Sequence, residues 1–181
     1  MKKTGFILIL LTLVGIGINI SCESDDICAS STSTTPSLII DAYDVSDTEE
    51  AKSITNLVVI GDGNDTVLSG YNIEDVTQIV LPLKTDSNVT RYTLIKEASV
   101  NDNGTPDNSS DDYYDGNQDV ITISYSRENV YVSRACGYKT IFNNVTLTIV
   151  SDSDNWIKSR QPLNDNQSVE DETETHFNIF H

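Results

Sequence analysis

Basic residues are scarce in this 181-residue chain, and that scarcity narrows its possible partners. It has 11 lysines and arginines against 28 aspartates and glutamates, so its formal net charge at pH 7 is −17. A surface of that sign repels phosphate backbones and anionic head groups, so we expect no nucleic-acid partner and no electrostatic attachment to a membrane. Divalent cations and basic protein surfaces are the electrostatic partners that this charge favours.

Histidine is also scarce, with only His176 and His181 present, both in the polar C-terminal segment. Neither is placed to act as a general base or to activate a nucleophile. Carboxylate pairs exist because acidic residues are abundant, but nothing selects one pair for glycoside hydrolysis. We therefore expect a non-enzymatic protein without a cofactor, calcium excepted, and a hydrolase ranks third among the alternatives.

The single long apolar run lies at the N-terminus. Lys2 and Lys3 precede "GFILILLTLVGIGINI", residues 5–20, which is shorter than the ~20 residues that span a bilayer comfortably. A basic start and a short apolar core are typical of a secretory signal, so we expect residues 1–21 to be a removed signal peptide.

Ser21 directly precedes Cys22, and this pair resembles the lipobox of bacterial lipoproteins, although Asn19 departs from the usual aliphatic residue. The resemblance implies that Cys22 carries acyl chains, which hold a protein to a bilayer at ~0.8 kcal/mol per buried methylene. The alternative is an ordinary signal peptide with Cys22 as a plain thiol. The following "ESDD" resembles the surface-export signal of Bacteroidota lipoproteins, or it is a solvated part of the tether that we expect over residues 22–36.

From residue 37 onward the apolar residues alternate with period two, which indicates strands rather than helices. The best examples are "SLIIDAYDV", "TQIVLPL", "RYTLI", "DVITISY" and "NVTLTIV", and "NLVVI" is fully apolar. Pro82 cannot donate to a ladder, so "TQIVLPL" is predicted at a sheet edge or a bulge. In "ISYSRENVYVS", a hairpin turn is predicted at residues 127–129.

About eight short strands separated by Gly, Asn and Asp predict an all-β fold, an antiparallel immunoglobulin-like β-sandwich over residues 37–162. The last segment, residues 163–181, contains "NDNQSVEDETET". Its polarity and acidity predict a flexible, disordered tail.

Three cysteines are present, and once Cys22 is assigned to lipid the remaining two form a pair. An even pair in an exported protein predicts a disulfide between Cys28 and Cys136. The alternative is a metal site, but two cysteines without a well-placed histidine make a poor zinc site.

Four segments together resemble a known family: "SCESDDIC", "TTPSLIIDAYD", "NLVVIGDG" and above all "ITISYSRENVYVSRACGYKTIF". They are similar to an uncharacterised family of Bacteroidota lipoproteins, a domain of unknown function. The resemblance implies a lipid-anchored protein of the outer membrane or cell surface with Cys28 and Cys136 paired. It also implies an association with outer-membrane β-barrel proteins, and it implies no activity.

The densest acidic segment is "SVNDNGTPDNSSDDYYDGNQD", residues 99–119. Calcium takes six to eight oxygen ligands, which loops with Asp or Asn at alternate positions around a glycine supply. The candidate calcium ligands are Asn101, Asn103, Asp107, Asp111, Asp112 and Asp115, and Asp119 could complete the shell. The alternative is a long solvated loop between strands. Tyr113 and Tyr114 could stack on sugars.

Two further features each have a functional and a structural interpretation. "GDGNDTVLSG", residues 61–70, resembles one repeat of a calcium-binding β-roll, but no second repeat follows, so a hairpin turn is predicted. Its Thr66 lies in "DTV", which fits the short O-glycosylation motif of Bacteroidota. Arg134 has the parity of Val132 and Cys136, so we expect it to point inward and to form a structural ion pair with a carboxylate.

The function expected from the sequence is therefore a non-enzymatic surface lipoprotein of the outer membrane. Its β-sandwich would bind or assist another envelope protein, with a β-barrel protein as a candidate partner. The alternative is a calcium- or glycan-binding module that uses residues 101–119.

Overall fold

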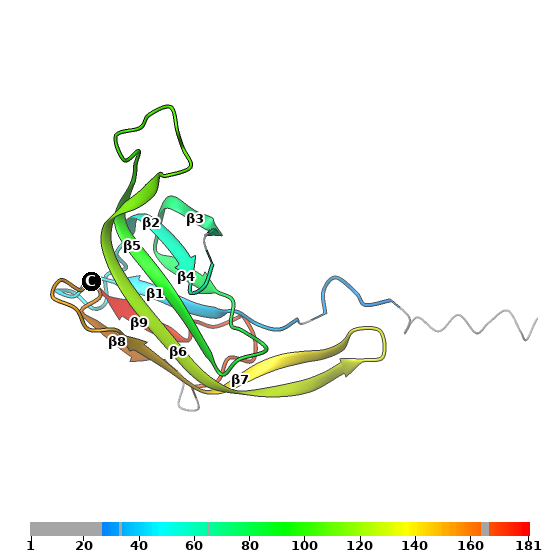
Figure 1. Ribbon diagram of the computed structural model, residues 1–181. Coiled ribbons are helices and arrows are strands. Elements are labelled where there is room, and N and C mark those ends of the chain that lie inside the picture. Colours follow the sequence, from blue (N-terminus) through cyan, green and yellow to red (C-terminus); the bar gives the residue numbers. More distant parts are fainter. Residues whose placement is uncertain (1–26, 33, 65, 164–166) are drawn as a thin grey trace, which may run out of the picture. The chain divides into compact units, whose positions relative to one another are not determined.

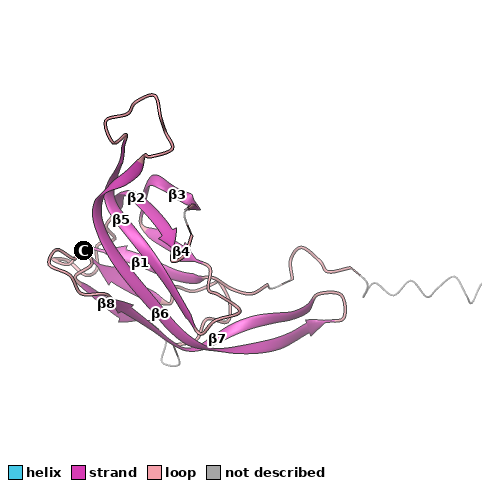
Figure 2. Cartoon of the chain, in the orientation of Figure 1, coloured by secondary structure: helices cyan, strands magenta, loops and turns pink. Residues whose placement is uncertain are grey.

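The computed structural model describes residues 27–32, 34–64, 66–163 and 167–181, and these residues form nine strands and no helix (Figure 2). In the same ranges there is no helix long and apolar enough to cross a membrane. The predicted signal peptide, Cys22 and part of the predicted tail lie outside the described residues.

The chain divides into two compact units, which are described separately. The first contains the residues up to Thr32 together with Tyr131–Tyr138. The second contains Ser33–Val130 and Lys139–His181, and it holds the hydrophobic core.

The strands belong to two sheets, one in the order β4-β1-β9-β8 and the other in the order β3-β2-β5-β6-β7 (Figure 1). Their bounds are β1 Leu38–Tyr43, β2 Ile54–Gly61, β3 Val67–Val76, β4 Gln78–Leu81, β5 Val89–Asn101, β6 Tyr113–Ser133, β7 Gly137–Ile149, β8 Ser159–Pro162 and β9 Phe177–Phe180. The predicted all-β sandwich is confirmed. The predicted edge position of "TQIVLPL" is also confirmed, because β4 is an edge strand that ends just before Pro82.

Alternation of apolar residues along the strands builds one core from both sheets. On β6 the residues Ile121, Ile123 and Tyr125 are buried in it, while Thr122 and Ser124 between them are only half-buried. The alternating apolar residues of β1, β4 and β5 likewise lie in the core, which contains residues from strands of both sheets. The core residues on the strands include Leu38, Ile40, Leu57, Val59, Ile79, Leu81, Leu94, Leu147, Phe177 and Ile179.

The fully apolar "NLVVI" has both faces covered, which explains why it does not alternate. Val59 faces the main core, whereas Val58 packs with Ile95 and Ala98 in a second, smaller cluster. Leu57, Val58 and Val59 are therefore buried, whereas Asn56 is exposed and Ile60 is half-buried.

The strand order corrects the expectation of an antiparallel immunoglobulin-like sandwich. In that fold the first, second, fifth and fourth strands share a sheet. Here β1 lies between β4 and β9, and its pairing with β9 is parallel, from Ile40 opposite Phe177 to Tyr43 opposite Phe180. Period-two alternation reports which face of a strand is buried and not which strand lies beside it, so the order was not predictable from it.

The expected flexible tail over residues 163–181 is wrong for its described part. Strand β9 fills the position between β1 and β8, and Val169, Phe177 and Ile179 are buried in the core. The short apolar segment "HFNIFH" follows the acidic run and is long enough for the four-residue strand β9.

The predicted turn at residues 127–129 is also wrong, because β6 runs through it to Ser133 and the turn lies at residues 134–136. Arg127 donates from Nε to Asn88 Oδ1 at 2.8 Å and from Nη1 to the Thr85 carbonyl, which holds this part of β6 against the preceding loop. Gly137, with φ of 72°, supplies the left-handed conformation after the turn. Arg134 lies in the turn and is exposed, which corrects its expected inward position.

Candidate functional site

In the first unit, Cys28 and Cys136 form a disulfide with their Cα atoms 4.9 Å apart and a sequence separation of 108. The predicted pairing is thus present, and it joins residues 27–32 to the turn after β6. The Cys136 N–H donates to Ser133 Oγ at 3.0 Å, which closes that turn. We call residues 27–32 and 131–138 together the disulfide tip.

The disulfide tip exposes large apolar side chains. Ile27 is 82% exposed, and Tyr131 and Tyr138 are 58% and 69% exposed. The two tyrosine rings meet edge to face with their centroids 5.4 Å apart. The two rings therefore pack against each other, and more than half of each tyrosine stays exposed to solvent.

In the second unit, the residues predicted to bind calcium do not converge. Asp102 and Asn101 accept hydrogen bonds from backbone N–H groups two residues ahead, and Asp111 accepts from Thr105 Oγ1 at 2.9 and 3.0 Å. Across the described ranges, no group of three or more His, Cys, Asp or Glu side chains is placed to hold a metal ion. The side-chain oxygens of Asn101, Asp102 and Asp111 accept hydrogen bonds from donors of the loop itself, and calcium binding stays a prediction.

Asp119 has a different role from the loop carboxylates around it. Its side chain is fully buried and accepts hydrogen bonds from the backbone N–H groups of Trp156 and Ile157, at 3.2 and 2.7 Å, and from Asn155 Nδ2 at 3.1 Å. It fixes the segment before β8 and is not available as a calcium ligand. Asp115, by contrast, is exposed and accepts from the Gly116 N–H.

Beside the acidic loop, a hollow of about 300 Å³ is lined by both tyrosines that the sequence singled out. Tyr113 is 50% exposed there, and Tyr114 is held by a 2.8 Å hydrogen bond from its hydroxyl to Asn72 Oδ1. Asp112 and Ser109 add a carboxylate and a hydroxyl to the lining. An aromatic face beside polar acceptors suits a sugar ring.

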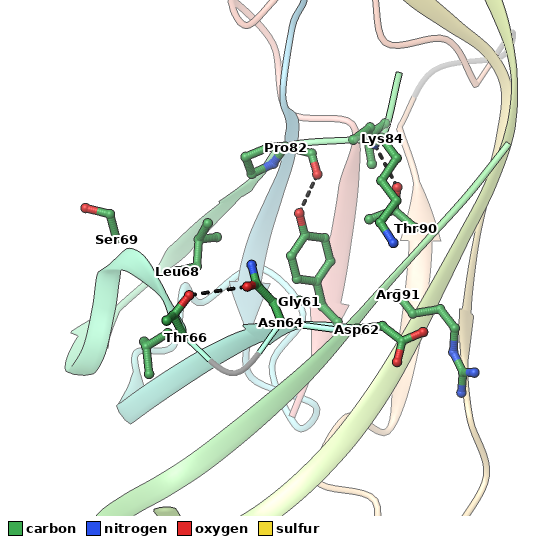
Figure 3. A pocket seen from close by; sticks show the side chains of 13 residues that line it. Gly61, Asp62, Asn64, Thr66, Leu68, Ser69, Pro82, Lys84, Thr90 and Arg91 are labelled. Carbon is green, nitrogen blue, oxygen red and sulfur yellow. Dashed lines mark hydrogen bonds between the residues drawn. The ribbon is translucent and has the colours of Figure 1, made fainter. Parts of the chain in front are cut away.

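A pocket of about 340 Å³ lies between the β2–β3 turn and the connection from β4 to β5 (Figure 3). The turn is the hairpin predicted at residues 61–70, and Thr66 of the "DTV" motif lines the pocket. Its other lining residues are Gly61, Asp62, Asn64, Val67, Leu68, Ser69, Pro82, Leu83, Lys84, Thr90, Arg91 and Tyr92. Apolar and hydroxyl-bearing side chains thus share one concave surface.

Buried side chains hold the β4–β5 wall of this pocket from inside the core. Tyr125 Oη donates to the Lys84 carbonyl at 2.9 Å, and the Lys84 N–H donates to Thr90 Oγ1, also at 2.9 Å. Because the tyrosine proton is already used, Thr90 Oγ1 donates to Tyr125 Oη across 2.6 Å. The three bonds form a closed ring that satisfies both backbone groups of Lys84.

Tyr92 holds the same wall at Pro82, whose carbonyl accepts a hydrogen bond from the tyrosine hydroxyl (Figure 3). Burial, with a smaller contribution from nearby Tyr125, raises the pKa of Tyr92 to about 12. Burial also raises the pKa of Tyr125. Both hydroxyls therefore stay protonated and act as donors, so the wall is formed before any ligand arrives.

The two histidines are structural, which the sequence did not predict. His176 Nδ1 accepts a hydrogen bond from the backbone N–H of Ile39 at 3.0 Å. The backbone N–H of His176 donates to the Ile39 carbonyl, also at 3.0 Å. The ring of His181 packs edge to face on Trp156 with centroids 5.6 Å apart. Burial lowers the pKa of both imidazoles below the ordinary value of 6.5, so each stays neutral at a pH where an exposed histidine begins to take up a proton.

The two sheets with a shared core place the chain in the class of all-β sandwich proteins. Within that class, the chain belongs to a family of unknown function, DUF6452, whose sequence profile matches residues 56–181. The match covers the pocket, the acidic loop and Cys136, whereas β1 and Cys28 precede it. No curated protein and no solved structure matches the chain.

Proposed function

We propose that the chain is a non-enzymatic lipoprotein of the outer membrane, anchored through Cys22 and exposed at the cell surface, that binds another envelope protein. The basic and apolar N-terminus with Ser21 before Cys22 supports the anchor. The disulfide between Cys28 and Cys136 supports a location outside the cytoplasm, because such bonds persist in oxidising compartments. An outer-membrane β-barrel protein is the first candidate partner.

The pocket between the β2–β3 turn and the β4–β5 connection carries the binding role. Concave sites with apolar walls and a few polar groups are typical of ligand sites, and about 340 Å³ lies at the small end of their range. Such a site accepts a partner's side chain rather than a long segment. The hydrogen-bonded ring at Lys84 keeps the wall rigid, which lowers the ordering cost of binding.

The anchor is tested by expressing the full chain in a bacterium that processes lipoproteins and labelling with a radioactive fatty acid. We expect label on the wild-type chain and on Cys136→Ala, and both in the outer-membrane fraction. Cys22→Ala should lose the label and leave that fraction, because acyl chains supply the attachment. A labelled Cys22→Ala chain, or an unlabelled wild type, would contradict the anchor.

The binding role is tested with a photoreactive amino acid in place of Ser69, an exposed residue of the pocket. The matched control carries it in place of Ser151, which is exposed after β7. Irradiation of intact cells should join the Ser69 variant to one envelope protein, while the Ser151 variant should give no specific product. Equal patterns from both variants would count against a partner in this pocket.

A second candidate function, glycan binding, is favoured by the hollow beside the acidic loop, where exposed Tyr113 lies near Asp112 and Ser109. Stacking of a sugar on an aromatic face needs the ring, so Tyr113→Ala should abolish binding on a glycan array. Tyr131→Ala removes a similarly exposed ring elsewhere and is the control. Absence of any bound glycan for the wild type removes this candidate.

Calcium binding by the same loop is the remaining alternative. Titration calorimetry with calcium, on the wild type and on a chain with Asp107, Asp111 and Asp112 changed to Ala, separates it from glycan binding. Heat that disappears in the variant would support it, and no heat with no thermal shift in the wild type would reject it.

A further inference from the structure

We propose that the disulfide tip lies on the lipid bilayer that holds Cys22 and forms a second contact with it, through Ile27, Tyr131 and Tyr138. This inference rests on the proposed lipid anchor at Cys22. It adds a surface contact to an attachment that would otherwise depend on acyl chains alone.

The first support is the chemistry of the exposed side chains. Ile27, Tyr131 and Tyr138 are between 58% and 82% exposed, which is a large apolar surface for so short a unit. Tyrosine is enriched where membrane meets water, because its ring is apolar and its hydroxyl is wetted. The edge-to-face pair of Tyr131 and Tyr138 leaves both rings accessible from outside.

The second support is a stretch of the chain without acidic residues. Between Asn129 and Ser151 there is no aspartate or glutamate, although 28 occur in the whole sequence. Carboxylates on this stretch therefore do not oppose an approach of Tyr131 and Tyr138 to a membrane. Glu23, Asp25 and Asp26 precede Ile27, so the contact depends on the apolar side chains of the tip and not on a net positive charge.

The third support is reach. Cys28 follows Cys22 by six residues, and a chain spans at most ~3.5 Å per residue, or ~21 Å in all, whatever path it takes. The disulfide then places the Cα of Cys136 4.9 Å from that of Cys28. A bilayer with its head groups is ~40–45 Å thick, so an acylated Cys22 keeps the tip within about half that thickness of the membrane surface.

The contact gives the disulfide a role beyond stability. Without it, the turn after β6 would be linked to Cys22 only through more than a hundred residues. With it, residues 131–138 stay near the bilayer, where burial of each apolar group adds to the attachment that the acyl chains supply.

The test uses the full lipidated protein in vesicles of phosphatidylethanolamine and phosphatidylglycerol, part of them with brominated acyl chains that quench nearby tryptophan. Tyr138→Trp places a reporter in the tip, and Tyr113→Trp places one at the loop, where the parent side chain is 50% exposed. Trp156 is present in both and is 4% exposed, so it forms a common background. We expect several-fold stronger quenching of the tip reporter than of the loop reporter.

Two changes should reduce that quenching to the level of the loop reporter, because each removes one support. They are Cys28→Ala with Cys136→Ala, which releases the tip, and Ile27→Ser with Tyr131→Ser, which removes two of its exposed apolar side chains. Circular dichroism should show an unchanged fold for the second variant, since both side chains are exposed. Quenching that is the same in all variants would overturn the proposal.

The outcomes also separate this inference from the proposed anchor. A chain that lacks acyl groups by mass spectrometry and does not float with vesicles refutes the anchor. A chain that is acylated and floats, but whose tip reporter is quenched no more than the loop reporter, refutes the tip contact alone. The tip reporter could instead be shielded from iodide only when envelope proteins are added, with no quenching by brominated lipid. That result assigns the tip to a protein partner and also overturns the proposal.

Discussion

The hydroxyls of Thr90 and Tyr125 lie 2.6 Å apart, 35 residues from each other in sequence, and together they close a hydrogen-bonded ring on the backbone of Lys84. Thr90 is 3% and Tyr125 6% exposed, so water cannot replace either partner fully. The hydrogen-bonded ring therefore joins the core to the pocket wall. Substitutions of these core residues should alter the structure of that wall.

Thr90→Val should destabilise the protein by roughly 1–3 kcal/mol, because it leaves the Lys84 N–H without its acceptor. Tyr125→Phe should cost a similar amount, and the double variant less than the sum, since both changes break one ring. Urea unfolding measures all three. Thr122→Val, on the same strand β6 and half-buried, is the control and should stay within about 0.5 kcal/mol of wild type. Strict additivity would contradict the ring.

Asp119 should be the most sensitive acidic residue of the chain. Asp119→Ala leaves the buried N–H groups of Trp156 and Ile157 unpaired, which should cost at least ~2–3 kcal/mol at ~1–3 kcal/mol for each unsatisfied group. Exposed Asp112→Ala should change stability by less than ~0.5 kcal/mol. Thermal and urea unfolding compare the two, and equal effects would show that Asp119 is not a structural acceptor.

Sequence alternation predicted which strand faces are buried, and Pro82 predicted the edge position of β4, because both depend on local chemistry. Asp119 was grouped with the loop carboxylates, although it shares the parity of buried Ile121 and Ile123 and could have been found from that. Its position in the alternation predicts a buried side chain, but the many acidic residues around it make it resemble a loop carboxylate.

Pairings between distant segments could not be predicted in this way. The pocket forms because β2 pairs with β5, which brings Gly61 opposite Tyr92. The parallel pairing of β1 with β9 likewise depends on which apolar segments fit together in the assembled core. Arg127 looked like a turn residue, yet its bonds to Asn88 and Thr85 exist only when β6 is beside the preceding loop.

Gly116 lies opposite an irregularity in β5 and allows close contact between the two strands. With φ of 149°, a Cβ placed there would lie 2.8 Å from the Lys96 carbonyl oxygen and 2.9 Å from Ile95 Cγ2. Backbone atoms cannot move aside easily, so Gly116→Ala should cost roughly 1–3 kcal/mol or more. Gly63 also has positive φ, 77°, but nothing within 4 Å, so Gly63→Ala should cost only ~1 kcal/mol of backbone strain. A loss for Gly116→Ala that is no larger than the loss for Gly63→Ala in urea unfolding would contradict the close contact.

The disulfide should stabilise the chain by restricting its unfolded state. Closing a loop of 108 residues is worth up to ~4–5 kcal/mol in the chain-entropy model. Cys28→Ala with Cys136→Ala should therefore lower the free energy of unfolding by at most that amount, while Cys22→Ala should leave it unchanged. Mass spectrometry without reductant should find the Cys28 and Cys136 peptides joined, and a free thiol at either position would contradict the bond.

His176 should make stability depend on pH near neutrality. Its burial lowers the pKa of the folded-state imidazole below the ordinary 6.5, although the charges of Asp171 and Glu172 oppose part of that shift. An unfolded chain therefore binds the proton first as pH falls, so the contribution to stability is complete above about pH 6.5 and is lost as pH falls towards the folded-state pKa. His181 has the same sign, because burial also lowers its pKa, and Lys96 and Lys52 lower it further.

His176→Asn is the matched variant for this pH dependence, because its Oδ1 can accept the Ile39 N–H in place of Nδ1 without titrating. Urea unfolding between about pH 8 and pH 5 should show a smaller loss of stability in the variant, by at most ~1.4 kcal/mol per pH unit for one imidazole. Asp44, whose pKa is lowered to about 2, loses its contribution to stability as pH falls through the ordinary carboxylate pKa towards that value, which is below this window. Identical slopes for wild type and variant would mean that His176 takes up its proton equally in the folded and unfolded chains.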